Sequence, residues 1–193
     1  MGKRKNKLSK EEQAEVEEWI YQNNTEETRM TDTMTIRVKC KTENQKLLVN
    51  AIKEKEIIVC SGPAGTGKTF LACAEALRLI KRNGKFKKIV IVKSVTTLKN
   101  EEIGFLKGNL REKMEPFMFS FVHNFEKLVG QSITSKLREL KTIEEMPIAY
   151  MRGINLDRSI IIIDEAQNIS QENIRTIMTR LGKDSKMIFL GDE

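Results

Sequence analysis

The sequence predicts an α/β fold, in which a mainly parallel sheet carries helices on both of its faces. Runs rich in β-branched residues alternate with amphipathic helical runs along most of the chain. The run at 160–163 is isoleucine throughout, as expected for a central strand covered on both sides. A glycine-rich loop joins a strand-like run to a helix-like run at 57–82. The 193 residues suffice for one core of this kind.

The first 34 residues predict an appendage outside that core. Ser9 and Glu12 form a capping box for a short helix over 9–23, and the polar, threonine-rich stretch 24–34 predicts a linker. The basic cluster at 3–7 suits either a contact with nucleic acid or a solvated terminus. We therefore expect a helix and linker over 1–34 and one α/β domain over 35–193.

Within 35–193, hydrophobic periodicity predicts the elements in order. Alternating or continuous apolar runs predict strands over 36–40, 57–61, 88–93, 159–163 and 186–190, and helical periods predict helices over 43–53, 68–82 and 171–181. Between them, Met and Phe residues recur at three- and four-residue steps from Met114 to Val129, which predicts a helix packed in the core. His123 falls outside that stripe, so we expect it on the surface.

Composition restricts the class of protein. The net charge of +7 and pI near 9.3 favour an acidic partner such as nucleic acid, with solvated lysines as the alternative. The three cysteines form no C-x-x-C pair, which indicates reduced thiols rather than disulfides or zinc. The basic start leads into no apolar core, and no apolar run could span a bilayer. We expect a soluble cytoplasmic protein without a membrane partner.

The loop GPAGTGKT at 62–69 fits the pattern G-x-x-x-x-G-K-[ST] of phosphate-loop (P-loop) NTPases. Lys68 would contact the β- and γ-phosphates of ATP, and Thr69 would ligate Mg²⁺. A glycine turn with a chance Gly-Lys-Thr is the alternative. The residues expected around the phosphates are Gly62, Pro63, Ala64, Gly65, Thr66, Gly67, Lys68 and Thr69.

An acidic pair follows the isoleucine run directly, where the second half of such a site belongs. We expect Asp164 to hold Mg²⁺ through water and Glu165 to orient or deprotonate the attacking water. Asp164-Glu165-Ala166-Gln167 resembles the D-E-A-Q box of helicase-type ATPases, in which a residue after the catalytic pair senses the nucleotide or couples to nucleic acid. The resemblance implies that role for Gln167.

Five ordered segments carry a wider resemblance: GPAGTGKT, EEIGFLKGNLREKMEPF, YMRG, IIIIDEAQN and TRLGKDSKMIFLGD. Over roughly 36–193 the chain resembles the phosphate-starvation-inducible PhoH-like ATPases, especially the short versions carried by phages. The family is described as cytoplasmic ATP-binding proteins with a superfamily-1-helicase-like, RecA-like core, sometimes fused to a nuclease domain, and with RNA as the suspected substrate. The resemblance implies a Mg²⁺-dependent ATPase, with helicase action on single-stranded RNA or DNA and RNA favoured. If phage-encoded, the protein would work in the host cytoplasm.

Further site residues are implied at matching positions. Gln45 resembles the adenine-reading glutamine of helicases, whereas its spacing from Thr42 also fits a capping box. Arg152 lies in a YxRG pattern and either couples ATP hydrolysis to nucleic acid or belongs to a solvated loop. Asp192, in the last segment, is a further candidate for coupling or nucleic-acid contact. The loop after the strand at 88–93 offers phosphate contacts for a passing strand, or is ordinary solvated loop; its candidates are Ser94, Thr96, Thr97 and Lys99.

The chain departs from the family pattern in ways that affect the expected site. Many relatives have Arg-Pro at Lys93-Ser94 and proline at Lys107, and they continue past Asp192 to a glutamine and a later arginine. We therefore expect the ATP site to be completed by a neighbouring copy in a homo-oligomer or by sequence beyond the C-terminus. There are two alternatives. A small-metabolite kinase would need an arginine-rich lid, and the sequence shows no obvious one. A non-catalytic nucleotide switch would not need the candidate base Glu165, so this residue argues against it.

Overall fold

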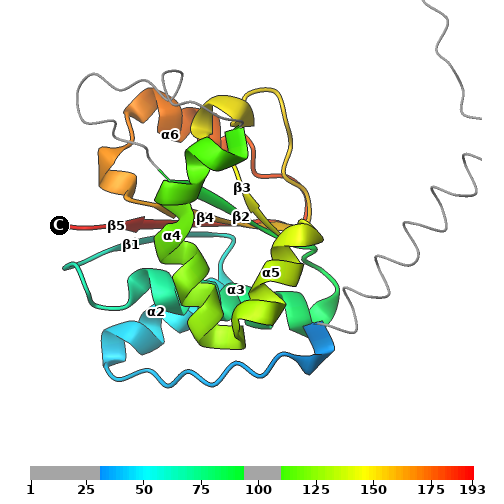
Figure 1. Ribbon diagram of the computed structural model, residues 1–193. Helices are drawn as coiled ribbons and strands as arrows, with labels where there is room; N and C mark the ends of the chain where they lie inside the picture. Colours follow the sequence, from blue (N-terminus) through cyan, green and yellow to red (C-terminus); the bar gives the residue numbers. More distant parts are fainter. Residues whose placement is uncertain (1–30, 94–109) are drawn as a thin grey trace, which may run out of the picture.

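The computed structural model describes residues 31–93 and 110–193. In this part of the chain the predicted RecA-like α/β fold is confirmed: five parallel strands form one sheet in the order β1-β5-β4-β2-β3 (Figure 1). The strands are β1 (Ile57–Ser61), β2 (Lys88–Lys93), β3 (Ile143–Glu145), β4 (Ser159–Asp164) and β5 (Lys186–Gly191). The helices are α2 (Glu43–Glu54), α3 (Lys68–Asn83), α4 (Leu110–Val129), α5 (Gln131–Glu139) and α6 (Gln171–Met178), with short 3₁₀ turns η2 (Ile148–Met151) and η3 (Ala166–Asn168).

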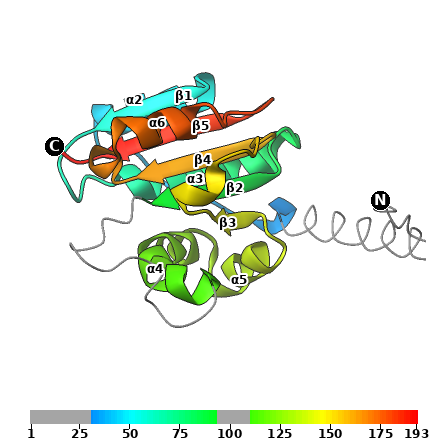
Figure 2. The same ribbon diagram turned by 90° about the horizontal axis from the view of Figure 1, so that it is seen from above.

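Helices cover both faces of the sheet. Figure 1 shows α2 and α3 below the sheet and α6 above it, and Figure 2 shows α4 and α5 beside the β3 edge, away from β1. Alternate residues of each central strand therefore enter two different cores. Ile160 and Ile162 of β4 pack with α2, α3, α4 and α5, whereas Ile161 and Ile163 pack with Met151 and Ile177 on the α6 side. The continuous isoleucine run is explained by this two-sided burial.

The register places the carboxyl ends of four strands at one edge. Ser61 of β1 pairs with Gly191 of β5, and Lys93 of β2 pairs with Asp164 of β4. Because all these strands are parallel, the loops that follow them gather at this edge, which is where open α/β sheets bind ligands.

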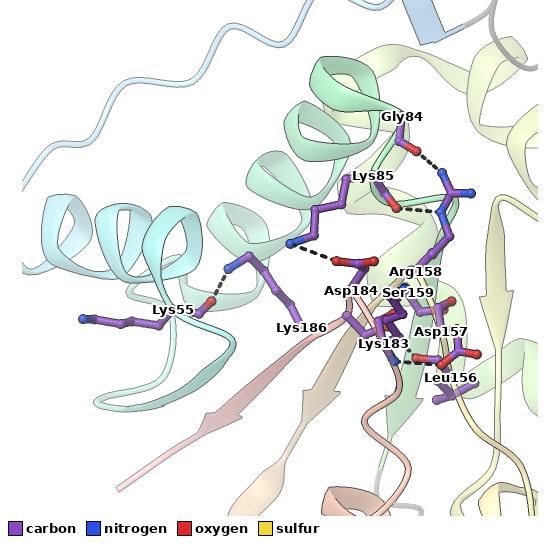
Figure 3. A network of polar contacts seen from close by, with 11 residues as sticks. Lys55, Gly84, Lys85, Leu156, Asp157, Arg158, Ser159, Lys183, Asp184 and Lys186 are labelled. Carbon is purple, nitrogen blue, oxygen red and sulfur yellow. Dashed lines mark hydrogen bonds and ion pairs between the residues drawn. The ribbon is translucent and has the colours of Figure 1, made fainter.

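A network of polar contacts lies at the opposite edge of the sheet, where the strands begin (Figure 3). Arg158 donates to the carbonyls of Gly84 and Lys85 just past the end of α3, and its own N–H donates to Lys183 O at 2.8 Å. Lys186 of β5 donates to Lys55 O, which follows α2. These bonds anchor the strand beginnings to α2 and α3, on the side of the sheet away from the carboxyl edge.

The prediction of a strand over 36–40 is wrong. This segment is extended but pairs with no strand among the described residues. Its carbonyls instead accept from α3: Arg78 donates to Ile36 O and Val38 O, each at 3.1 Å. Met34, assigned to the linker, is 1% exposed and packs in the core with α3.

The other strands and helices predicted within the described residues lie where expected, except that α6 ends at Met178 and not at residue 181. Helix α5, strand β3 and the two 3₁₀ turns were not predicted. His123 is exposed, as predicted, and stacks on Phe119. The predicted helix over 9–23 lies outside the described residues. No helix in the described ranges is both long and apolar enough to cross a bilayer.

Candidate phosphate and nucleotide site

The phosphate loop, Gly62–Thr69, connects β1 to α3 at the carboxyl edge of the sheet. Gly65 and Gly67 have φ values of +77° and +87°, which only glycine adopts without strain. Gly67 is the N-cap of α3 and gives it no side-chain cap, so the first amides of the helix stay available to an anion. The local sequence therefore builds an anion-binding turn.

Lys68 lies at the centre of this turn. Its ammonium donates to Gly62 O at 2.7 Å and to Pro63 O at 2.8 Å. It also forms an ion pair with Asp192 Oδ1 at 2.8 Å, just past the end of β5. The side chain of Lys68 is 11% exposed, so this cation is held against the loop.

Thr69 and Asp164 meet beside the loop. Thr69 Oγ1 donates to Asp164 Oδ1 at 3.3 Å, which joins the start of α3 to the end of β4. Burial raises the pKa of Asp164, while the nearby Lys93 cation acts to lower it. A hydroxyl and a carboxylate are oxygen donors of the kind that Mg²⁺ prefers, so these two residues fit the magnesium role.

Glu165 and Gln167 form the next layer of the site. Glu165 has a φ of +54°, an uncommon conformation for a residue other than glycine. Gln167 Nε2 donates to Glu165 Oε2 at 2.7 Å, and Gln167 Oε1 accepts from the backbone N–H of Asp192 at 3.1 Å. The amide thus links the candidate water-activating carboxylate to the residue that pairs with Lys68.

Gln45 lies on the other side of the phosphate loop. Its Nε2 donates to Thr66 O at 3.0 Å, and its Oε1 accepts from Lys41 N at 2.6 Å. Thr42 caps α2 by accepting from Gln45 N at 3.2 Å, but the Gln45 side chain does not return to Thr42, so the capping box is only half formed. A cleft of about 750 Å³ opens here, lined by residues between 38 and 48 and between 60 and 71.

The remaining predicted residues are not brought to this centre. Arg152 is exposed and lies 3.9 Å from Glu172 of α6. No arginine in the described ranges bonds to Asp164 or Glu165; Arg180, just after α6, donates instead to Ile154 O. The candidate loop residues Ser94, Thr96, Thr97 and Lys99 lie outside the described residues.

Three contacts of the site were not predicted: the Lys68–Asp192 pair, the Gln167 bridge and Lys93 beside Asp164. Each joins strands that are distant in sequence, and the order β1-β5-β4-β2 is what brings them together. The signal that could have found them is the position of Lys93 and Asp192 at strand ends, combined with the strand order.

The family model described as PhoH-like protein matches residues 37–193. The chain belongs to the PhoH-like protein family. It is 39% identical over 186 residues to a PhoH-like protein of Bacillus subtilis. This match covers 96% of the present chain and 56% of the relative. It is 37% identical to a PhoH-like protein of Synechocystis (80% of this chain, 47% of the relative) and 31% identical to protein PhoH of Escherichia coli (82% and 45%). The chain thus spans about half the length of the curated relatives it matches.

Solved structures give a weaker likeness. A Sulfolobus solfataricus SWI2/SNF2 ATPase core has a TM-score of 0.46 at 17% identity, over 82% of this chain and 33% of that one. The large terminase of a thermophilic bacteriophage has a TM-score of 0.44 at 11% identity, over 78% and 38%. The family assignment therefore rests on the sequence match alone.

Proposed function

We propose that the chain binds ATP with Mg²⁺ at the carboxyl edge of the sheet, hydrolyses it, and uses the hydrolysis for helicase-like work on single-stranded nucleic acid, RNA in particular. One observation carries the proposal: the start of α3, with Lys68 and Thr69, meets the end of β4, with Asp164 and then Glu165, through the Thr69–Asp164 hydrogen bond beside the glycine-rich turn. The membership in the PhoH-like family agrees with it.

Nucleotide binding would use the two sides of the phosphate loop. The loop amides and Lys68 would hold the phosphates, as in other P-loop proteins. The cleft between Gln45 and the loop would take the base and sugar, with the Gln45 amide offering a donor and an acceptor to the adenine edge. To do so, Gln45 would exchange its bonds to Thr66 O and Lys41 N.

Hydrolysis would depend on the acidic pair. Thr69 and Asp164 would hold Mg²⁺, which supplies neutralisation of the phosphate charge. Glu165 would take a proton from water as the water oxygen attacks the γ-phosphorus, and ADP would leave with its bridging oxygen. Lys68 would stabilise the charge that develops on the equatorial oxygens.

The nucleic-acid part of the proposal rests on different support. The net charge of +7 favours a polyanionic partner, and the D-E-A-Q box resembles that of helicase-type ATPases. Stacking contacts with the bases of a single strand would be few, since aromatic residues make up only 6% of the sequence, and contacts with the phosphate backbone would dominate.

The test is ATP turnover by the full chain, measured alone and with single-stranded RNA, single-stranded DNA and duplex DNA. We expect the largest stimulation by single-stranded RNA. ATP·Mg²⁺ at about 100 times its dissociation constant should stabilise the fold by about 2.7 kcal/mol, and Lys68→Ala should remove this stabilisation. An unchanged thermal shift in Lys68→Ala would contradict the assignment of the site.

A further inference from the structure

We propose that Asp192 competes with a nucleotide phosphate for Lys68, and that Gln167 is a positioning residue that holds Glu165 from the end of β5. The inference rests on the proposed function, because both residues act on how the same site treats ATP. It assigns separate effects to the two residues, one on affinity and one on turnover.

The first step concerns the bonding capacity of Lys68. The Lys68 ammonium donates to Gly62 O and Pro63 O, and it also forms an ion pair with Asp192 Oδ1 at 2.8 Å. A phosphate oxygen that approaches Lys68 from the side of Asp192 must displace the carboxylate, and one that approaches from the loop must displace a carbonyl. The two carbonyls are neutral and belong to the loop backbone, whereas the Asp192 carboxylate carries the same charge as the phosphate.

Repulsion between like charges makes Asp192 the group that leaves. Its side chain is 38% exposed and hangs from rotatable bonds just past the end of β5, so it can turn toward solvent. A nucleotide phosphate that reaches Lys68 from that side must break this ion pair, which lowers the apparent affinity for nucleotide. The carboxylate thus sets the nucleotide concentration at which the site fills.

The second step concerns Gln167. Its Oε1 accepts from the backbone N–H of Asp192, and its Nε2 donates to Glu165 Oε2. A carboxamide can do both at once because it carries an acceptor and donors on one rigid group. The bond from Asp192 N–H fixes which way the amide points, and the amide then fixes one oxygen of Glu165.

Gly191 makes this approach possible. A Cβ at position 191 would lie 3.3 Å from Gln167 Oε1, which is tighter than most contacts of this kind. Glu165 itself stands in the left-handed region with φ +54°, a conformation that costs free energy for a residue other than glycine and persists where surrounding contacts hold it. Gln167 supplies one such contact, to the carboxylate.

The first experiment measures the dissociation constant of ATP·Mg²⁺ for Asp192→Asn, by titration with a non-hydrolysable ATP analogue. The variant removes the charge and keeps the shape and the backbone N–H. We expect binding about 3- to 10-fold tighter than wild type. The control is Asp184→Asn, which removes a carboxylate paired with Lys85 at the opposite edge of the sheet and should leave the affinity unchanged.

Unchanged or weaker binding by folded Asp192→Asn would overturn the competition, since it would make Asp192 neutral or a helper in nucleotide binding. If Asp192→Asn does not fold, the same titration is carried out with Asp192→Ser, for which tighter binding supports the competition and unchanged or weaker binding overturns it. Absence of ATP binding by wild type would instead refute the proposed function, so the two failures are distinguishable.

The second experiment measures both kcat and the dissociation constant of the ATP analogue for Gln167→Leu. This variant keeps a side chain of similar size and loses the amide group. We expect kcat to fall by about 10- to 100-fold with the dissociation constant of the analogue within about 2-fold of wild type. Gln167→Glu, which cannot donate and repels Glu165, should show the same split. Normal kcat in Gln167→Leu, or a loss confined to affinity, would overturn the positioning role.

Discussion

Glu165 has two properties that meet in one residue: an uncommon backbone conformation and a carboxylate bonded by a neighbouring amide. A side chain that activates water must hold a negative oxygen in a fixed direction. Asp164, one residue earlier on β4, already bonds to Thr69 and faces the phosphate loop. The turn at Glu165 therefore separates the partners of two adjacent carboxylates, as the two roles that we propose for them require.

Replacing Glu165 by Gln should slow ATP hydrolysis by about 10²- to 10⁴-fold and retain ATP binding, because only the proton acceptor is removed. The measurement is single-turnover hydrolysis alongside analogue titration. Near-normal turnover would place the base on another residue.

Lys186 offers a pH-dependent prediction at the opposite edge. Burial, and then the Lys85 cation, lower its pKa from the ordinary 10.5 (Figure 3). Between the lowered pKa and 10.5 the unfolded chain binds more protons than the folded chain, so this residue makes the free energy of unfolding rise with pH in that window. Lys186→Met should abolish the contribution.

The check is urea unfolding of wild type and Lys186→Met at about pH 7, 9 and 10, which spans the window below the ordinary lysine pKa. The stability of wild type relative to the variant should increase toward the highest pH. Lys183→Met, at an exposed position on the preceding turn, controls for the loss of a lysine at this edge. A pH-independent difference for Lys186→Met would contradict the shifted pKa.

At the scale of single residues, the sequence predicted which residues lie around the phosphate loop, but not which hydrogen bonds and ion pairs they form. Lys68, Thr69 and Asp164 were predicted from the loop pattern and from a strand ending in acid, since both patterns are local. The pairing of Lys68 with Asp192 depends on β5 lying beside β1, and strand order is not encoded by local patterns. Gln45 was predicted with two alternatives, and it bonds to the phosphate loop.

At the scale of elements, the segment 34–40 is held to α3 by cations rather than by a strand ladder. Arg78 donates to two of its carbonyls and pairs with Glu75, whose side chain is 1% exposed, and Lys81 donates to Asp32 O and Met34 O. This segment leads directly to Lys41, whose N–H bonds to Gln45 beside the cleft. The docking of the segment therefore also shapes the nucleotide side of the site.

Arg78→Met should destabilise the fold by about 2–3 kcal/mol, because it leaves the buried Glu75 carboxylate without its partner. The loss stays below the value for a fully buried ion pair, since the Arg78 side chain is about a third exposed. The same substitution should also weaken ATP binding. The measurements are urea unfolding and analogue titration.

Two variants control for this effect. Arg82→Met, an exposed arginine on the same helix, should change neither quantity. Glu75→Met combined with Arg78→Met should regain part of the lost stability, because no unpaired buried charge remains. A double variant as unstable as the sum of the two single variants would argue against the ion pair as the cause.

The wrong strand at 36–40 and the unpredicted β3 share one cause. Ile36, Val38 and Cys40 alternate as a strand would, but the carbonyls of Ile36 and Val38 accept from the Arg78 side chain of α3. Alternation reports only which side chains face the core. β3 is the short run Ile-Glu-Glu, which carries too little pattern to be recognised, and it forms through pairing with β2. Tertiary contacts decide both cases.

At the scale of the whole molecule, the proposed site has one feature unaccounted for. Phosphoryl transfer in this class commonly uses an arginine worth about 10³- to 10⁵-fold in rate. Of the arginines that flank β4 and lie in or just after α6, Arg158 bonds to Gly84 O and Lys85 O at the opposite edge, and Arg180 bonds to Ile154 O and Thr179, while Arg152 and Arg175 are exposed. A neighbouring copy is the source we favour.

Specific ATPase activity should therefore be low in dilute solution and rise with protein concentration, in parallel with the size measured by light scattering. Arg152→Ala should leave the low dilute activity unchanged. Fast, concentration-independent hydrolysis by a proven monomer would show instead that the site is complete within one chain.

The order of the strands also governs when the fold can form. Ile57 of β1 pairs with Met187 of β5, and Ile161 of β4 pairs with the same residue from the other side. The latest of the five strands in the chain is thus the one that joins the phosphate loop to the acidic strand. On the ribosome, β1 emerges early and has no ladder until residues 186–191 follow. The chain must close long loops between distant segments before its central pairings form, which is the topology of slow folding. Until then Ile57–Ser61 remains an unpaired apolar strand, and protection of this segment during synthesis is a requirement set by the sheet order itself.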